Sequence, residues 1–406
     1  MSPSAKAPTA VGLYLTGVQF LFAVGWIVYV IYLPALAEQA GLSKSAVPWL
    51  LLMDQLIFVV CDLAVGVWSD QAAGVLGRIG WGVLGVTLLS TVAFLMLPWV
   101  APRGSAGLFV AITALWAATS AALRVPPLTL LGRYVGKPDV PWLMSLVLLG
   151  TGIASAVSPY LGLMLKGMDP RLPFALAGLS LAAITAGMVW AERALSQQRA
   201  VARAAELKAV APPRALLTER DGVAPFSGFL LAALLAAAAA QVHTHLVAAP
   251  LYLRHAPATM LPVLMPVFWV GFNLALMPAS LAVRRFGALP VMAGSMLVAA
   301  ACSAGAWNAT SLEALLPVQG LAGAAWGVGL MSGFSAAVFF GQVGREGFTG
   351  GALNSALAAA ALSRIAMVTF VAPAPVVAAQ WGWVPALLFA VSAALLCAIW
   401  PRSRSD

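Results

Sequence analysis

The stretch that decides the fold runs from residue 46 to residue 68 and reads AVPWLLLMDQLIFVVCDLAVGVW. Two acids, Asp54 and Asp62, interrupt a run that is otherwise almost entirely apolar. Because about 20 residues of α-helix cross the hydrocarbon core of a bilayer, the run predicts a membrane-spanning helix. Ionisable side chains inside such a helix are costly, so both acids are candidate functional residues.

The rest of the chain repeats this apolar pattern. Of its residues 62% are apolar and only 9% are charged, whereas a soluble domain carries about 25% charged residues. We therefore expect an all-α polytopic membrane protein embedded in a lipid bilayer, not a large soluble enzyme. Twelve spans are predicted near residues 11–33, 46–68, 79–101, 107–131, 141–165, 172–191, 225–252, 260–282, 289–309, 314–340, 350–373 and 383–400.

One long polar stretch separates the first six spans from the last six. We expect an N-terminal half at 1–191, a cytoplasmic linker at 192–224 and a C-terminal half at 225–406. The Ala-rich first part of the linker predicts a surface helix that ends before Pro212-Pro213. Two halves of six spans are a common organisation among transporters.

The distribution of basic residues predicts the topology. If both termini are cytoplasmic, 15 of the 22 Lys and Arg residues lie on the cytoplasmic side and five lie in the outer loops. This bias follows the positive-inside rule and accounts for the net charge of +9 without a nucleic-acid partner. We expect a multi-pass protein of the cell membrane, a bacterial inner membrane, that functions as a monomer.

Catalytic and metal chemistry have little support in the sequence. Three His, three Cys and 13 acidic residues offer few reactive groups, and neither a Cys-x-x-Cys pattern nor a nucleotide-binding loop occurs. His243 and His245 are two residues apart, so on a helix they point to opposite faces and do not share one metal ion. We expect no enzymatic activity, no cofactor and no metal site.

The residues after the second span resemble a known motif. Gly66-Val-Trp-Ser-Asp70, with Arg78 after it, is similar to the Gly-x-x-x-Asp start and basic end of the signature loop of the major facilitator superfamily. The wider pattern, Asp62-Leu-Ala-Val-Gly66-Val-Trp-Ser69-Asp70, resembles the glycoside-pentoside-hexuronide cation symporters, related to melibiose permease. Those symporters carry a second carboxylate one turn before Asp62, where this chain has Phe58.

The resemblance implies transport by alternating access between the two halves, driven by a proton or sodium gradient. It places Gly66, Asp70 and Arg78 at the gate and gives Asp62 an ion-coupling role. A small organic solute that enters by symport is the first expectation. Ala154-x-x-x-Ser158-Pro159 in the fifth span is similar to a proton-antiporter motif, so a proton-coupled exporter is the alternative. A non-transporting membrane assembly factor of the same fold is the third.

Matched depths predict how the intramembrane charges pair. Asp62 and Arg124 each lie roughly 10–13 Å from the cytoplasmic end of their spans, at 1.5 Å per residue. The sequence therefore predicts an ion-coupling pair of Asp62 and Arg124 within the N-terminal half. Asp54 and Arg364 lie at matched depths from the outer end, which predicts an inter-half gate salt bridge. The alternative is that each of these two side chains snorkels or bonds the backbone within its own half.

Aromatic and polar side chains inside the spans are candidates for solute binding. In the superfamily the spans that carry Trp26 and Trp116 line the cavity, although packing is an equal alternative for these rings. His245 shares a helix face with Gln241. The full set of expected substrate-binding residues is Trp26, Tyr29, Gln55, Trp116, His245, Asn273, Gln319 and Asn354.

Overall fold

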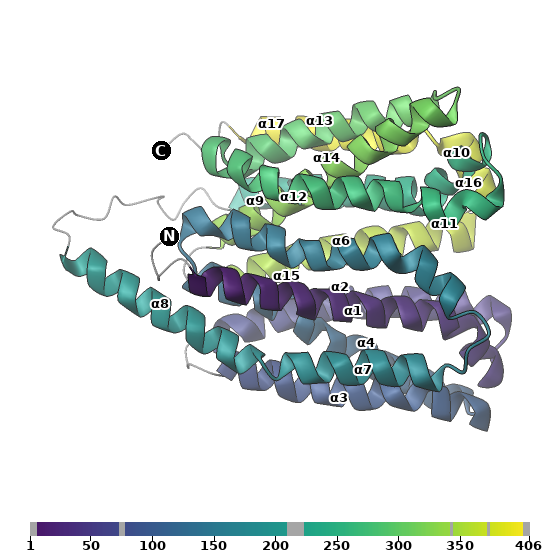
Figure 1. Cartoon of the computed structure of the whole chain (residues 1–406), viewed down its shortest axis with the longest axis horizontal. Coiled ribbons are helices and arrows are strands. Elements are labelled where there is room, and N and C mark those ends of the chain that lie inside the picture. Colours follow the sequence, from purple (N-terminus) through teal and green to yellow (C-terminus); the bar gives the residue numbers. More distant parts are fainter. Residues whose placement is uncertain (1–5, 73–77, 209–222, 342–343, 372–373, 401–406) are drawn as a thin grey trace.

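The computed structural model describes residues 6–72, 78–208, 223–341, 344–371 and 374–400. Every regular element among these residues is helical (Figure 1). The α-helices are α1 (Lys6–Gln39), α2 (Val47–Ala72), α3 (Arg78–Val100), α4 (Ala106–Ser120), α5 (Pro126–Tyr134), α6 (Val140–Met164), α7 (Arg171–Thr185), α8 (Met188–Lys208), α9 (Val223–Val242), α10 (Ala248–Leu253), α11 (Leu261–Leu264), α12 (Pro266–Phe286), α13 (Ala288–Trp307), α14 (Leu312–Phe340), α15 (Glu346–Ala366), α16 (Ala374–Trp381) and α17 (Val384–Ile399).

The predicted spans fall on these helices. Eleven helical segments of the described chain are long and apolar enough to cross a membrane. The twelfth apolar helix, α17, has 16 residues, which at 1.5 Å per residue is about 24 Å. The predicted all-α, twelve-span architecture is therefore confirmed, with a shorter last span.

All the long helices run along one bundle axis. We call the end at which α1 begins, α17 ends and α8 protrudes the linker end, and the other the opposite end (Figure 1). The predicted surface helix is confirmed by α8, which continues to Lys208, while Pro212 and Pro213 lie outside the described residues. Glu192, the first residue of the expected linker, is buried and accepts a hydrogen bond from the Gly80 amide.

Several spans depart from regular α-helix, three of them near the candidate site. Span four breaks between α4 and α5 through the 3-10 turn η4 (Ala121–Leu123), because Pro126-Pro127 cannot continue the hydrogen-bond ladder. Spans seven and eleven contain the π-helical segments η6 (His243–Val247) and η8 (Met367–Val371). Such irregular turns occur frequently at functional sites and hinges.

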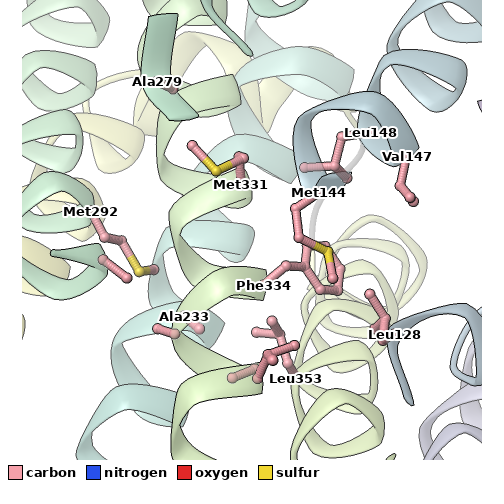
Figure 2. Close-up of a cluster of buried hydrophobic side chains, with 14 of the residues drawn as sticks. Leu128, Met144, Val147, Leu148, Ala233, Ala279, Met292, Met331, Phe334 and Leu353 are labelled. Atoms are coloured by element: carbon pink, nitrogen blue, oxygen red, sulfur yellow. The ribbon is translucent and has the colours of Figure 1, made fainter. Parts of the chain in front are cut away.

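The hydrophobic core is shared between the halves at the linker end. One cluster of buried side chains combines residues of both halves, among them Met144 of α6, Phe334 of α14 and Leu353 of α15 (Figure 2). At the opposite end each half has a cluster of its own, one within residues 28–177 and one within residues 242–315. There the rings of Trp49 and Phe370 still join α2 to η8, with centroids 5.1 Å apart.

Candidate functional site

The predicted pairing of Asp62 with Arg124 is confirmed. An Arg124 guanidinium nitrogen lies 3.1 Å from Asp62 Oδ2, and the Asp62 side chain has no exposed surface. The two side chains come from α2 and from the break in span four, where Arg124 follows η4. Gln19 of α1 donates to the Leu123 carbonyl at 2.9 Å and so satisfies one acceptor that the break frees.

Phe58 completes the surroundings of this ion pair. Its ring stands at the position where the resembled symporters have a second carboxylate, and the Arg124 guanidinium carbon lies 4.5 Å from the ring centroid. Among the described residues the Asp62 carboxylate oxygens accept no well-aligned hydrogen bond. The two side chains therefore interact as an ion pair without a well-aligned hydrogen bond, beside the face of the Phe58 ring.

The backbone of Asp62 belongs to the contact between the halves. A Cβ atom added to Gly351 of α15 would lie 2.5 Å from the Asp62 carbonyl oxygen, and Ser355 donates to the Val59 carbonyl at 2.8 Å. Gly66 packs directly on the Gly347 backbone. The Asp62–Arg124 ion pair and the contact between the halves thus lie in the same region of α2.

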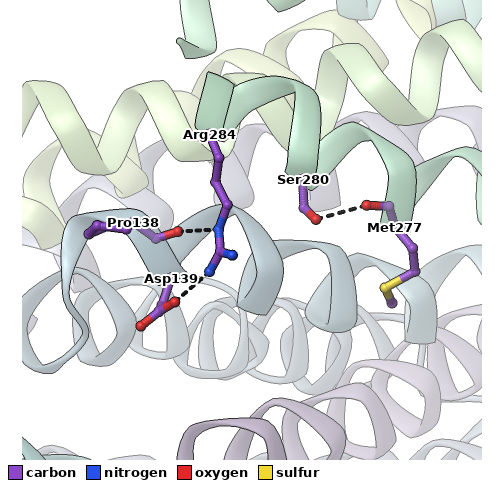
Figure 3. Close-up of polar contacts among 5 residues, drawn as sticks. All are labelled: Pro138, Asp139, Met277, Ser280 and Arg284. Atoms are coloured by element: carbon purple, nitrogen blue, oxygen red, sulfur yellow. Dashed lines mark hydrogen bonds and ion pairs between the residues drawn. The ribbon is translucent and has the colours of Figure 1, made fainter. Parts of the chain in front are cut away.

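Asp70 holds the start of α15. Its two carboxylate oxygens accept hydrogen bonds from the amides of Gly347 and Phe348 at 2.6 and 2.8 Å. A carboxylate of the N-terminal half thus compensates the partial positive charge at the N-terminus of a helix in the C-terminal half. Arg78 begins α3 and is exposed. A second cross-half contact at the linker end joins Arg284 of α12 to Asp139 and to the Pro138 carbonyl (Figure 3).

The predicted salt bridge of Asp54 with Arg364 is wrong for this structure, and each side chain instead bonds another side chain, not the backbone, of its own half. Tyr29 donates to Asp54 Oδ2 at 2.8 Å within the N-terminal half, and Arg364 Nε donates to Gln241 Oε1 at 2.9 Å within the C-terminal half. The reason is the side of α15 on which Arg364 lies. Arg364 follows Ser355 by nine residues, about 180° around α15, so it points away from α2 although its depth matches.

The aromatic candidates mainly pack on one another. Tyr29 and Trp116 are buried with ring centroids 4.5 Å apart, and Trp26 stacks on Trp116 at 5.8 Å while keeping accessible surface. A cavity of about 20 Å³ beside Trp116 has room for about one water molecule and none for an organic solute. Of these three rings, Trp26 keeps the most accessible surface.

The polar candidates divide in the same way. Gln55, Gln319 and Asn354 are buried, whereas Asn273 and His245 keep accessible surface. Gln319 Oε1 lies 2.8 Å from His243 Nε2, so His243 is a buried, hydrogen-bonded residue. Asn273 and Asn354 each donate to a carbonyl of their own helix. No cluster of three potential metal-ligating side chains occurs within the described ranges.

Sequence reasoning overlooked several participants. Gln241 entered only as a neighbour of His245, and the cross-half pair of Arg284 with Asp139 was not foreseen, although basic and acidic residues flank the corresponding loops. The glycines at 347, 350 and 351 recur on one face of α15 and signal a close helix approach. The π-helical segments have no signal that we recognise in the sequence.

Comparison with solved structures defines the class of fold. Neither a protein-family model nor a curated protein sequence matches the chain. A bacterial homologue of the iron transporter ferroportin, in an outward-facing state, superposes with a TM-score of 0.67 at 14% identity over 96% of this chain and 99% of its own. FucP, a major facilitator superfamily transporter crystallised in the outward conformation, gives 0.65 at 14% identity over 97% and 99%.

The human organic anion transporter MFSD10 (TETRAN) also matches, with a TM-score of 0.67 at 14% identity over 98% of this chain and 100% of its own. At such low identity these matches show the fold. The chain therefore has the fold of the major facilitator superfamily transporters, in agreement with the resemblance of its signature loop. The matched structures do not single out the melibiose permease-like subgroup.

Proposed function

We propose that this protein is a secondary active transporter that moves a small organic solute by alternating access and couples it to proton symport. The observation that carries the proposal is the buried ion pair of Asp62 and Arg124 on the inter-half contact. A buried pair contributes little net stability, but a change in either charge strands its partner, which suits a switch between two states.

The coupling step follows from this geometry. A proton that neutralises Asp62 removes the charge that holds Arg124, and the change falls where the Asp62 carbonyl packs on Gly351 of the other half. A ligand shifts a two-state equilibrium only by its differential affinity for the two states. Protonation therefore drives the transition if the pair forms in one state and opens in the other.

The surroundings of Asp62 favour a proton over sodium. A hard cation requires several oxygen ligands, whereas Asp62 has Phe58 and Arg124 beside it. The shared core and the Asp70 cap close the linker end in this structure. If the linker end is cytoplasmic, as the distribution of basic residues predicts, this structure is closed toward the cytoplasm.

The test uses the full chain in proteoliposomes that contain a pH-sensitive dye. Symport predicts that an inward solute gradient acidifies the lumen, an exporter that exchanges solute for protons predicts alkalinisation, and an assembly factor predicts no change. Asp62→Asn is expected to abolish the proton movement, whereas Asp169→Asn, which alters an exposed contact within one loop, is expected to retain it. Unchanged coupling in Asp62→Asn would refute the role of Asp62.

A further inference from the structure

Arg364 is a cation inside a membrane span without an acidic partner. The ion pairs among the described residues are Asp62 with Arg124 and Asp139 with Arg284. The one polar contact found for Arg364 within the described ranges is from Nε to the neutral amide oxygen of Gln241, 2.9 Å away. Because an unpaired charge at membrane depth is costly, a side chain in this position needs a functional explanation.

The neighbouring acid does not supply the missing charge. Asp54, the acid at a matching depth, is held by the Tyr29 hydroxyl in the other half. Arg364 points about 180° away from the face of α15 that packs on α2 through Ser355. The guanidinium is therefore directed into the C-terminal half, toward α9.

His245 lies beside Arg364 and keeps accessible surface. Its side chain is exposed, and Arg364 is close enough for its charge to act on the imidazole. His245 lies four residues after Gln241, so the two lie near one face of the helix and border the same space as Arg364.

The backbone around this contact is irregular on both helices. The π-helical segment η6 starts two residues after Gln241, and η8 starts three residues after Arg364. Single π-helical turns are rare and occur frequently at functional sites. Two of them beside one side-chain contact are an observation independent of the unpaired charge.

The contact leaves the binding edge of Arg364 free. Gln241 takes Nε and orients the planar group, while the two terminal nitrogens have no hydrogen bond or ion pair within the described chain. Two parallel N–H groups match the two oxygens of a carboxylate, and such bidentate contacts are both strong and specific. One guanidinium compensates one negative charge.

We propose that Arg364, oriented by Gln241 and flanked by His245, binds the carboxylate of the transported solute, which is an organic monocarboxylate. This inference names the substrate class and rests on the proposed transport function. With the carboxylate bound, each buried cation of the bundle has an anionic partner, Asp62 for Arg124 and the solute for Arg364. A neutral solute would leave Arg364 uncompensated.

The experiment measures ligand-dependent thermal stabilisation of the purified full chain in detergent. The probes are organic monocarboxylates, among them lactate, benzoate and nicotinate, each compared with its own primary amide at equal ionic strength. We expect carboxylates to raise the melting temperature and their amides to leave it unchanged. For the best carboxylate, Arg364→Gln should weaken binding by about tenfold or more.

Matched variants separate a binding role from a structural one. Arg364→Lys keeps the positive charge but lacks the two parallel N–H groups of the guanidinium, so it should bind carboxylates with intermediate affinity. Gln241→Ala leaves the guanidinium in place but removes the group that orients it, and should also weaken binding. Arg285→Gln, on the exposed surface, should bind as the unaltered protein does. Equal stabilisation by acids and amides across the panel, or unchanged affinity in Arg364→Gln, would overturn the proposal.

The two proposals can fail separately. Asp62→Asn should lose proton coupling and still bind the carboxylate through Arg364. Proton-coupled uptake of a neutral solute, with no effect of Arg364→Gln, would overturn the carboxylate site and leave the transport function standing. Arg364-dependent binding of carboxylates without any proton movement would overturn the proton-coupled transport function and leave the carboxylate site standing.

Discussion

At the scale of single residues, burial decides what each intramembrane charge contributes. Asp62 is fully buried, whereas 17% of the Arg124 side chain is exposed. Water can therefore solvate Arg124 after its partner is lost, while Asp62 is relieved only by taking up a proton. The two halves of the pair are not equivalent, and this asymmetry is testable.

Removal of either partner should destabilise the protein, and removal of the arginine should do so more. We expect Arg124→Gln to lower the free energy of unfolding by about 3–5 kcal/mol and Asp62→Asn by less. The double variant should recover part of the loss, because it strands no charge. Denaturant unfolding in detergent measures the cycle, and strictly additive losses would contradict a direct pair.

The contact of Tyr29 with Asp54 provides a second test. Tyr29→Phe leaves a buried carboxyl oxygen without its donor, so we expect a loss of about 1–3 kcal/mol. Tyr252→Phe is the matched control, because the Tyr252 hydroxyl is buried without a hydrogen-bond partner in the described chain. Thermal unfolding compares the two variants. A loss in Tyr252→Phe as large as that in Tyr29→Phe would reject the explanation.

At the scale of helices, the crossing of α2 with α15 depends on glycine. Gly66 on one helix faces Gly347 and Gly351 on the other, so the backbones approach without side chains between them. The same crossing carries Asp62 and, one helical turn after Gly66, Asp70 on the amides that begin α15. A change in helix separation here acts on the charge site and on the gate together.

Gly66→Ala should therefore be more harmful than an ordinary helical substitution. Its Cβ would meet the Gly347 backbone, which cannot rotate away, and we expect a destabilisation of about 1–3 kcal/mol. Gly85→Ala is the control, since no atom lies within 4 Å of the added Cβ, and it should be neutral or stabilise by up to about 1 kcal/mol. Melting temperatures decide the matter, and equal values would argue against a close approach at Gly66.

At the scale of the whole molecule, the halves share one core at the linker end and keep separate cores at the opposite end. Alternating access requires that this shared core opens. A covalent link across it should therefore stop transport without damage to either half.

Leu128 and Gly350 offer such a link. A Cβ added to Gly350 lies 3.4 Å from Leu128 Cβ, close to the separation found in disulfides. In a background without the three native cysteines, Leu128→Cys with Gly350→Cys should cross-link under oxidation and lose transport, and reductant should restore it. Each single variant should transport under both conditions. Full transport by the cross-linked protein would show that the halves do not separate here.

The sequence by itself determined the helices, their number and the depth of each charge, because hydropathy and the rise per residue depend only on chain order. Depth was sufficient for Asp62 and Arg124, whose pairing was predicted. It was insufficient for Asp54 and Arg364, because a salt bridge also requires that two helices turn the right faces toward each other. Helix rotation is set by packing, as at Gly66 and Gly351. Only the tertiary structure therefore decided which charges meet and that Arg364 has no acidic partner among the described residues.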